Sequence, residues 1–256
     1  MLSKNQIKFV NSLRQKKYRE EHNLFIAEGA KIVPELLASG IKVKQVFATS
    51  AFLRQHQLDA AIERFEIKEA ELERISTLMT PNEALALCEI PAYELDANAL
   101  KDNLTLVLDE IKDPGNMGTI IRIADWFGIG NIVCSPTSVD VFNPKVVQAT
   151  MGSIARIKIH FLELAAFIEE QKKVNAVPVF GALLEGESIY SKQLPSKGLI
   201  VIGNESKGIS EELQQLITDR ISIPSFSHFS QSGGEAESLN AAIATAIICS
   251  EFRRGQ

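Results

Sequence analysis

Short apolar runs recur along the second half of the chain, each bounded by polar or turn-forming residues. Five of them are rich in branched side chains, which is typical of buried strands: LTLVLDEI, NIVCS, VPVFGALL, LIVIGNE and RISIPS. Segments with a helical spacing of apolar residues fall between several of these runs. Because strands that alternate with helices usually pair in parallel, the pattern predicts an α/β fold with a mainly parallel sheet.

The N-terminal part repeats this alternation on a smaller scale. The pattern predicts a strand and a helix within FIAEGAKIVPELLASG, a strand at VKQVFAT, and further alternation up to ALALCEIP. The polar segment AYELDANALKDN, residues 92–103, separates two strand-like runs and is interpreted as a linker. We therefore predict two domains, a smaller α/β domain over residues 1–95 and a larger one over residues 103–256.

The first twenty residues predict a helix with a basic outer face. Ile7, Val10 and Leu13 recur at the spacing of one helix face, which leaves the basic side chains outward. These basic residues are Lys4, Lys8, Arg14, Lys16, Lys17 and Arg19. An isolated charge run is most often an ordinary solvated surface. It is nevertheless the richest positive segment of a chain with a net charge of -5, and Arg253 and Arg254 form a smaller second patch.

Cysteine and histidine usage indicates a cytosolic protein without a metal site. The three cysteines are widely separated and lie in apolar runs, as reduced core residues do: Cys88, Cys134 and Cys249. The four histidines have no partner at metal-ligand spacing. No segment has the pattern of a signal peptide or a membrane span, so we expect a cytoplasmic protein with no membrane contact.

The loop after LIVI has the composition of a ligand-binding loop. Gly203 and Gly208 let backbone amides approach a bound group, which first suggests a phosphate site. A P-loop, however, requires its lysine after the second glycine, whereas Lys207 precedes Gly208. The dinucleotide pattern G-x-G-x-x-G is absent from the loop, and Glu205 would repel a pyrophosphate. The loop is therefore predicted to receive a ligand other than a bare polyphosphate.

A second candidate segment, DPGNMGTIIRIADWFGIGN, follows the first strand of the larger domain. A turn leads to Asn116 at the N-cap position of a helix, whose apolar face is formed by Met117, Ile120, Ile121, Ala124 and Phe127. Arg122 lies on another side, about 9 Å along the axis from Asn116, and its long side chain can lean back toward the strand ends. On spacing alone, a simple capping asparagine and a solvated arginine are the favoured interpretation.

A third candidate segment follows RISIPS. A loop rich in serine and glycine leads to Ser238, Leu239 and Asn240, which open an apolar final helix. Helix capping alone would explain Ser238. Three strand-to-loop transitions with small and polar residues, in this order, form a much narrower signature than any single one.

With this signature, residues 103–256 resemble the SpoU (TrmH) family of RNA ribose 2′-O-methyltransferases, within the SPOUT superfamily. Its three motifs occur in the expected order: N-x-G-x-x-x-R at Asn116, Gly118 and Arg122; G-x-E-x-x-G after a strand at Gly203, Glu205 and Gly208; and I-P followed by S-L-N at Ile223, Pro224, Ser238, Leu239 and Asn240. Residues 1–95 resemble the ribosomal-protein-like RNA-binding domain that often precedes this catalytic domain, through FIAEG and TPNEALALCEIP.

The resemblance implies S-adenosyl-L-methionine as the cofactor and a C-terminal trefoil knot. The residues expected to contact the cofactor are Gly203, Asn204, Gly208, Ile223 and Leu239. Arg122 would act on the ribose hydroxyl, either as a base or as a phosphate anchor that polarises the hydroxyl. The anchor is preferred, because a guanidinium stays protonated near neutral pH. The residues expected to shape the site around Arg122 are Asn116, Glu205, Ser238 and Asn240.

The resemblance also implies partners. The substrate would be structured RNA, with ribosomal RNA ahead of transfer RNA, and the basic N-terminal residues would contact it. The catalytic domains would pair into a homodimer. The loop SFSHFSQSGGEAE, residues 225–237, is longer than the usual connection in the family. This length favours a mobile lid or a surface loop over a new catalytic element.

Two other functions compete with the methyltransferase hypothesis. A catalytically silent RNA-binding or ribosome-assembly protein would lose motif residues, whereas all of them are present. A doubly wound nucleotide-binding enzyme would carry a phosphate fingerprint at its first βα turn, which is absent. The sequence therefore favours an RNA methyltransferase.

Overall fold

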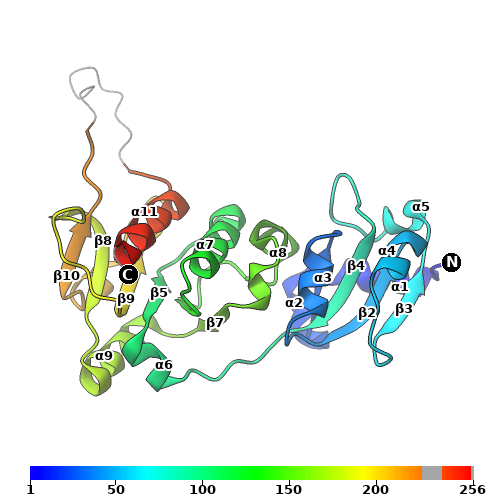
Figure 1. The fold of residues 1–256 in the computed structure, drawn as a ribbon, viewed down its shortest axis with the longest axis horizontal. Helices are drawn as coiled ribbons and strands as arrows, with labels where there is room; N and C mark the ends of the chain where they lie inside the picture. Colours follow the sequence, from blue (N-terminus) through cyan, green and yellow to red (C-terminus); the bar gives the residue numbers. More distant parts are fainter. Residues whose placement is uncertain (227–237, 255–256) are drawn as a thin grey trace. The chain divides into compact units, whose positions relative to one another are not determined.

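A computed structural model of the chain describes residues 1–226 and 238–254, and for residues 97–99 it describes the backbone only. The long loop predicted at residues 225–237 therefore lies outside the described part from residue 227 onward. The chain divides into two compact units (Figure 1). The N-terminal unit comprises Met1–Ala92 and Asp140–Arg156, and the C-terminal unit comprises Tyr93–Val139 and Ile157–Gln256. Within the described residues, no helix is long and apolar enough to cross a membrane.

The N-terminal unit is built around a mixed four-stranded sheet. Its elements are α1 (Lys4–Ser12), α2 (Lys16–His22), β1 (Leu24–Glu28), α3 (Ile32–Leu37), β2 (Val43–Ala48), α4 (Ser50–Gln55), β3 (Glu63–Glu66), α5 (Glu69–Leu72), β4 (Ala84–Glu89), α8 (Pro144–Thr150) and the 3-10 turn η1 (Ser153–Ala155). The strand order is β1-β4-β2-β3. β4 is antiparallel to β1 and β2, whereas β2 and β3 are parallel. The predicted strands and helix of this unit are confirmed.

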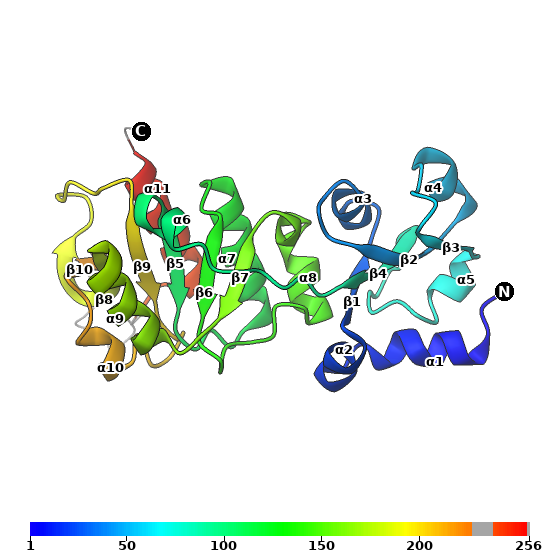
Figure 2. The same cartoon turned by 90° about the horizontal axis from the view of Figure 1, so that it is seen from below.

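The hydrophobic core of this unit has two layers, one on each face of the sheet. On β4, Ala84, Ala86 and Cys88 face one layer, and Leu85 and Leu87 face the other, because successive side chains of a strand point to opposite faces. The first layer packs against α3 and α4, and the second packs against α1 and α5. Figure 2 shows α3 and α4 on one side of the sheet and α1 on the other. Both faces are therefore covered by helices.

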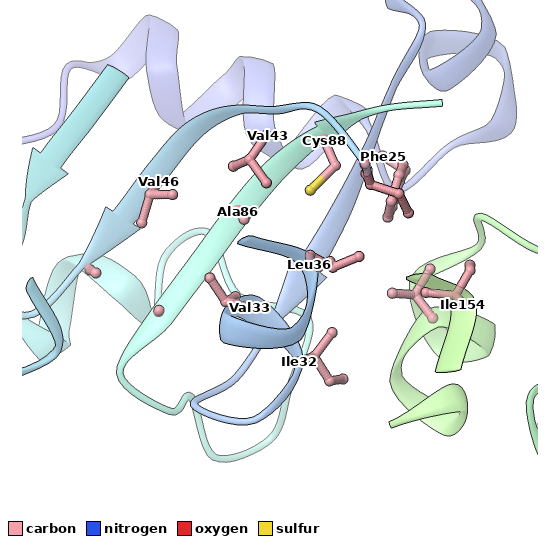
Figure 3. Close-up of a cluster of buried hydrophobic side chains, with 14 of the residues drawn as sticks. Phe25, Ile32, Val33, Leu36, Val43, Val46, Ala86, Cys88 and Ile154 are labelled. Atoms are coloured by element: carbon pink, nitrogen blue, oxygen red, sulfur yellow. The ribbon is translucent and has the colours of Figure 1, made fainter. Parts of the chain in front are cut away.

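The segment Asp140–Arg156 belongs to this unit although it follows two strands of the larger domain in the sequence. Val147 of α8 and Ile154 of η1 are buried in the first core layer, and Figure 3 shows Ile154 opposite Phe25 of β1. Arg156 also forms an ion pair with Glu35 of α3, with an Nη1 to Oε2 distance of 2.5 Å. Apolar burial and this ion pair together fix the segment on the N-terminal sheet.

The predicted basic outer face of the N-terminal helix is wrong at one residue, Arg19. Lys4, Lys8, Lys16 and Lys17 are exposed as predicted, but Arg19 is only 2% exposed, so its predicted outward placement is wrong. Its Nη1 donates to the carbonyls of Leu13 and Arg14 at 2.8 and 2.9 Å, and its guanidinium forms an ion pair with Asp140. A buried guanidinium needs such partners for all its donors, so Arg19 is a structural residue.

The C-terminal unit contains a six-stranded sheet in which every strand pair is parallel. Its elements are α6 (Ala97–Asp102), β5 (Leu104–Leu108), α7 (Pro114–Trp126), β6 (Asn131–Cys134), β7 (Lys158–Phe161), α9 (Leu164–Asn175), β8 (Val179–Ser188), β9 (Gly198–Ile202), α10 (Glu211–Gln214), β10 (Asp219–Ser222) and α11 (Ala241–Arg253). The order is β10-β8-β9-β5-β6-β7. The predicted parallel sheet is confirmed, while the trefoil knot stays a prediction.

Two elements of this unit escaped the sequence pattern. β7 is an edge strand in which only His160 is buried, so it lacks an apolar run. α6 lies within the predicted linker, and its Leu100 is fully buried against the sheet and α9. The predicted linker is thus partly folded onto the C-terminal unit.

The helices of this unit form two layers around the sheet. α6, α9 and α10 share a buried apolar cluster with one face of the sheet, while α7 and α11 lie on the other (Figure 1). All three cysteines of the chain are buried, and burial raises the pKa of each thiol. For Cys249 of α11 the pKa rises to about 12. The prediction that the cysteines are core residues is confirmed.

Parallel strands place the three motif loops at one edge of the sheet. The loops follow β5, β9 and β10, and the carboxyl ends of parallel strands lie at the same edge. β5 and β9 are direct neighbours, and β8 alone separates β9 from β10. Segments far apart in the sequence are brought together here.

Candidate functional site

The loop from Gly203 to Gly208 turns so tightly that its first residue must be glycine. A Cβ atom on Gly203 would lie 2.2 Å from the backbone carbon of Gly208 and 2.3 Å from the nitrogen of Ile209. The backbones of Asn204 and Gly208 exchange two hydrogen bonds of 3.0 and 2.9 Å. Gly208 has a φ of 70°, in the region that favours glycine. Both glycines of the motif are therefore explained by backbone geometry.

The Asn204 side chain holds this loop in place. Its Oδ1 accepts hydrogen bonds from the backbone amides of Ser206 and Lys207 at 3.0 and 3.1 Å. Its Nδ2 donates to the carbonyl of Glu110 at 2.8 Å. Glu110 follows β5 and has a positive φ of 55°, which is uncommon for a residue with a side chain. Asn204 thus ties the loop after β9 to the end of β5.

A cavity of about 480 Å³ opens beside the loop. All five residues predicted to contact a cofactor line it: Gly203, Asn204, Gly208, Ile223 and Leu239. Apolar side chains of β8, β9, β10 and α11 form much of its wall, and Glu185, Glu205, Lys207 and Arg220 contribute charge. Its volume lies in the range of about 300–1,000 Å³ that is usual for small-molecule sites. Residues of the second and third motifs therefore line this cavity, whereas Asn116, Gly118 and Arg122 of the first motif do not.

One hydrogen-bonded chain joins the three motifs. Nδ2 of Asn240 donates to Oδ1 of Asn116 at 2.8 Å, and Nδ2 of Asn116 donates to Oε1 of Glu205 at 3.0 Å. The backbone amide of Asp113 also lies 3.4 Å from the same carboxylate oxygen. Glu205 lines the cavity, so the chain of polar groups reaches its wall. Asn116, Glu205 and Asn240 therefore lie in one region, and Ser238 lies on the wall of the same cavity.

The N-cap predicted for Asn116 is wrong. Asp113 caps α7, because its Oδ1 accepts the backbone amide of Asn116 at 2.7 Å. The Asn116 amide group is therefore available to bond Glu205 and Asn240. At α11, Asn240 is the cap, and its Oδ1 accepts the amides of Ala242 and Ile243 at 2.9 and 3.2 Å. Asn240 uses its oxygen for the helix and its nitrogen for the motif network.

Arg122 lies apart from this network. It is exposed on α7, does not line the cavity, and has no hydrogen bond or ion pair within residues 1–226 and 238–254. The helix places it nearly two turns beyond Asn116. The structure thus leaves its guanidinium available to a bound partner without assigning one.

Several residues that sequence reasoning missed support the site. Asp109 Oδ2 accepts the Ser210 amide at 2.8 Å and fixes the far end of the glycine loop. Outside the cavity lining, Lys192 bridges Asp219 of β10 and Glu187 of β8 at 2.9 and 3.2 Å, and these bonds raise the pKa of Lys192 and lower that of Asp219. Among the supporting residues, only Asp113, the N-cap of α7, could have been recognised from the sequence, because Asp before Pro-Gly is typical of a turn or a helix cap. In the described part of the chain, no group of histidine, cysteine or acidic residues could hold a metal ion.

Comparisons with known proteins agree with this geometry. Residues 103–250 match the SpoU rRNA methylase family, and residues 4–86 match the MRM3-like substrate binding domain. The chain is 30% identical over 253 residues to the 23S rRNA (guanosine(2553)-2′-O)-methyltransferase RlmP of Bacillus subtilis, with 98% of this chain and 97% of that protein covered.

Two solved structures cover nearly the whole chain. One, from Porphyromonas gingivalis, is assigned to the TrmH family of RNA methyltransferases and is 42% identical, with a TM-score of 0.89 and all of both chains covered. The other, an AdoMet-bound rRNA methyltransferase from Sinorhizobium meliloti, is 30% identical, with a TM-score of 0.83 over 99% of this chain and 96% of that one.

The chain belongs to the SpoU rRNA methylase family. The prediction of an RNA methyltransferase of this family is therefore confirmed, as is that of an N-terminal domain that accompanies it.

Proposed function

We propose that the protein transfers the methyl group of S-adenosyl-L-methionine to a ribose 2′-hydroxyl of ribosomal RNA. The observation that carries the proposal is the hydrogen-bonded chain from Asn240 through Asn116 to Glu205, which joins the three motifs at the cavity wall. The relative from Bacillus subtilis is named for 2′-O-methylation of 23S rRNA, and the Sinorhizobium meliloti structure holds AdoMet. Ribosomal RNA is therefore preferred to transfer RNA.

The residues of the cavity fit this cofactor. Apolar side chains such as Ile223 and Leu239 suit an adenosine, and the opposite charges of Glu205 and Lys207 suit a zwitterionic amino acid. The close approach of Gly203 to Gly208 keeps the loop compact against the cavity. When bound, S-adenosyl-L-methionine supplies a methyl group that its sulfonium has already activated.

The remaining task of the protein is to position the ribose and to help its proton leave. We assign Arg122 to the substrate phosphate, where its permanent positive charge also polarises the 2′-hydroxyl. Asn116, Glu205 and Asn240 hold the loops in register, and Ser238 shapes the cavity wall. We further assign RNA binding to residues 1–95, catalysis to residues 103–256, and the protein to the cytoplasm.

The function is tested on unmethylated 23S rRNA made by transcription. Incubation with the protein and S-adenosyl-L-methionine is expected to yield a 2′-O-methylated nucleoside, detected by mass spectrometry after digestion. A 2′-O-methyl group also makes the neighbouring phosphodiester bond resistant to alkali, which locates the target. Methylation of a base in place of the ribose, or of no RNA, would contradict the proposal.

The exposed lysines of the N-terminal unit are expected to contact the RNA backbone. Replacing Lys4, Lys8, Lys16 and Lys17 together by Gln should weaken RNA binding and flatten its salt dependence. Each lost contact to a single-strand phosphate lowers the slope of log K against log salt by about 0.7. Titrations at several salt concentrations measure this slope, and calorimetry should show unchanged S-adenosyl-L-methionine affinity. An unaltered slope would place the RNA elsewhere.

We also propose that the protein is a homodimer that buries the exposed apolar residues of α7 and α11. Trp126 and Ile243 are 85% and 54% exposed, and the two helices that carry them pack against each other. Such exposed large side chains suit a covered interface. Sedimentation should give twice the chain mass of 28.2 kDa, and the Trp126→Glu, Ile243→Glu double variant should be a monomer. Met79→Glu, at a fully exposed position of the N-terminal unit, is the control.

A further inference from the structure

A shallow groove lies between α1 and β2 in the N-terminal unit. Five residues line it and enclose about 250 Å³: Asn5, Gln6, Phe9, Gln45 and Phe47. We refer to it as the α1–β2 groove. Asn5 and Phe9 lie one turn apart on α1, and Gln45 and Phe47 lie on the same face of β2. The lining residues therefore share one side because of the regular residue spacing of a helix and a strand.

The α1–β2 groove has an aromatic floor. Phe47 is 1% exposed, and its ring stacks on that of Phe65 with centroids 4.7 Å apart and planes 9° apart. Phe9 is only partly buried and meets the ring of His22 edge-on at 5.0 Å. The floor is thus rigid, and one partly exposed ring remains available to a ligand.

Amide groups surround this floor with unused hydrogen-bonding capacity. The Gln6 oxygen accepts both the amide and the hydroxyl of Ser3 at 2.9 Å, which leaves its NH₂ group as a donor. Gln45 donates to Glu63 at 2.6 Å, which leaves its oxygen as an acceptor. The Asn5 side chain has no hydrogen bond within the described residues. The rim therefore offers both donors and acceptors.

The helix that carries the rim is positively charged. α1 contains no acidic residue, and Lys8 lies three positions after Asn5, so their side chains are neighbours on the helix surface. No carboxylate of the described residues lies within 4.0 Å of the ammonium group of Lys4 or Lys8. Glu63 is the one carboxylate that forms a hydrogen bond with a lining residue in the described part of the chain, and its partner is Gln45. Lys4 and Lys8 are available for phosphates.

We propose that the α1–β2 groove is a subsite for an unstacked nucleobase of the RNA substrate. Proteins read RNA mainly at unstacked bases, which stack on aromatic side chains and pair their edges with polar groups. An apolar side chain of a protein partner would cover the amides without pairing them, whereas a nucleobase edge matches both donors and acceptors. The inference rests on the proposed function, because it requires an RNA substrate.

Two variants test the subsite independently. Phe9→Leu keeps the apolar bulk and removes the aromatic ring, and the Asn5→Ala, Gln45→Ala double variant removes rim amides that no core packing requires. Loss of one stacked base should weaken binding to transcribed 23S rRNA about 5- to 100-fold. The amide variant should weaken it about threefold or more. Gln55→Ala removes an exposed amide from α4, on the opposite face of the sheet, and should bind as wild type.

Salt dependence separates the subsite from the lysines. Stacking involves no phosphate, so both groove variants should keep the wild-type salt slope while their affinity falls. In a transcript that contains 4-thiouridine, irradiation should cross-link wild-type protein within the peptides of α1 or β2. Both variants should reduce that cross-link.

The outcomes distinguish the two proposals. If the wild-type protein binds and methylates the transcript but both groove variants keep its affinity within twofold, the subsite is refuted and the proposed function stands. If the wild-type protein neither binds nor methylates RNA, both are refuted. A changed salt slope in the groove variants would also overturn the subsite, because it would indicate a phosphate contact in place of a stacked base.

Discussion

Arg122→Ala is expected to lower the rate of methyl transfer about 100-fold or more. Arg122 is exposed on α7, and its removal breaks no hydrogen bond or ion pair among the described residues. The loss would fall on the substrate, because a phosphate anchor fixes where the ribose hydroxyl lies. Single-turnover methylation of 23S rRNA measures the rate, and calorimetry should show unchanged S-adenosyl-L-methionine affinity.

Arg54→Ala serves as the matched control for this variant. Arg54 is an exposed arginine on α4 of the N-terminal unit, so its removal lowers the net charge equally without touching α7. Its transfer rate should equal that of the wild type. Near-normal activity of Arg122→Ala would identify Arg122 as an ordinary surface residue and remove it from the proposed mechanism.

Gly203→Ala should lower the affinity for S-adenosyl-L-methionine about 100-fold or more. The added Cβ would lie 2.2 Å from the backbone carbon of Gly208, and backbone cannot move aside as the end of a side chain can. The loop must therefore open, which displaces Asn204 and Gly208 from the cavity wall. Overpacking of this kind costs about 1–3 kcal/mol, so thermal melting should show a less stable but folded protein. Isothermal titration calorimetry measures the cofactor affinity.

Gly130→Ala is the control for the glycine loop. A Cβ at Gly130 meets no atom within 4 Å, and the residue lies in the same unit. Its cofactor affinity and melting temperature should match the wild type. Cofactor binding by folded Gly203→Ala within twofold of wild type would show that the loop does not hold the ligand.

Most of the fold could be predicted from hydrophobic pattern alone. Strands such as β5 and β9 are buried along their whole length, and such strands in a parallel sheet read as continuous apolar runs. β7 has no such run and was overlooked, although the alternation of Ile157, Ile159 and Phe161 with polar residues is typical of a half-buried strand. A similar reason hid α6, because the buried Leu100 lies in a polar segment.

The loops that form the candidate site could be predicted from the sequence, but the hydrogen bonds between them could not. The order of three strand-to-loop transitions pointed to the loops, and the family resemblance then supplied Gly203, Glu205 and Asn240 as site residues. The capping role assigned to Asn116 was wrong, because Asp and Asn are nearly equivalent N-cap residues and the pattern cannot choose between Asp113 and Asn116. The choice matters, since it releases the Asn116 amide for Glu205.

The sequence by itself determined the α/β character of both halves and the parallel sheet, because these follow from local periodicity, and its resemblance to a known family supplied the residues of the three motifs. Only the tertiary structure decided which of these residues meet. Asn116 bonds Glu205 and Asn240 across 89 and 124 positions of the chain, and the burial of Arg19 depends on Asp140, 121 positions away. A sequence pattern reports the neighbours of a residue within one helix turn or one strand. Contacts at such separations arise only when the sheet brings the strand ends together.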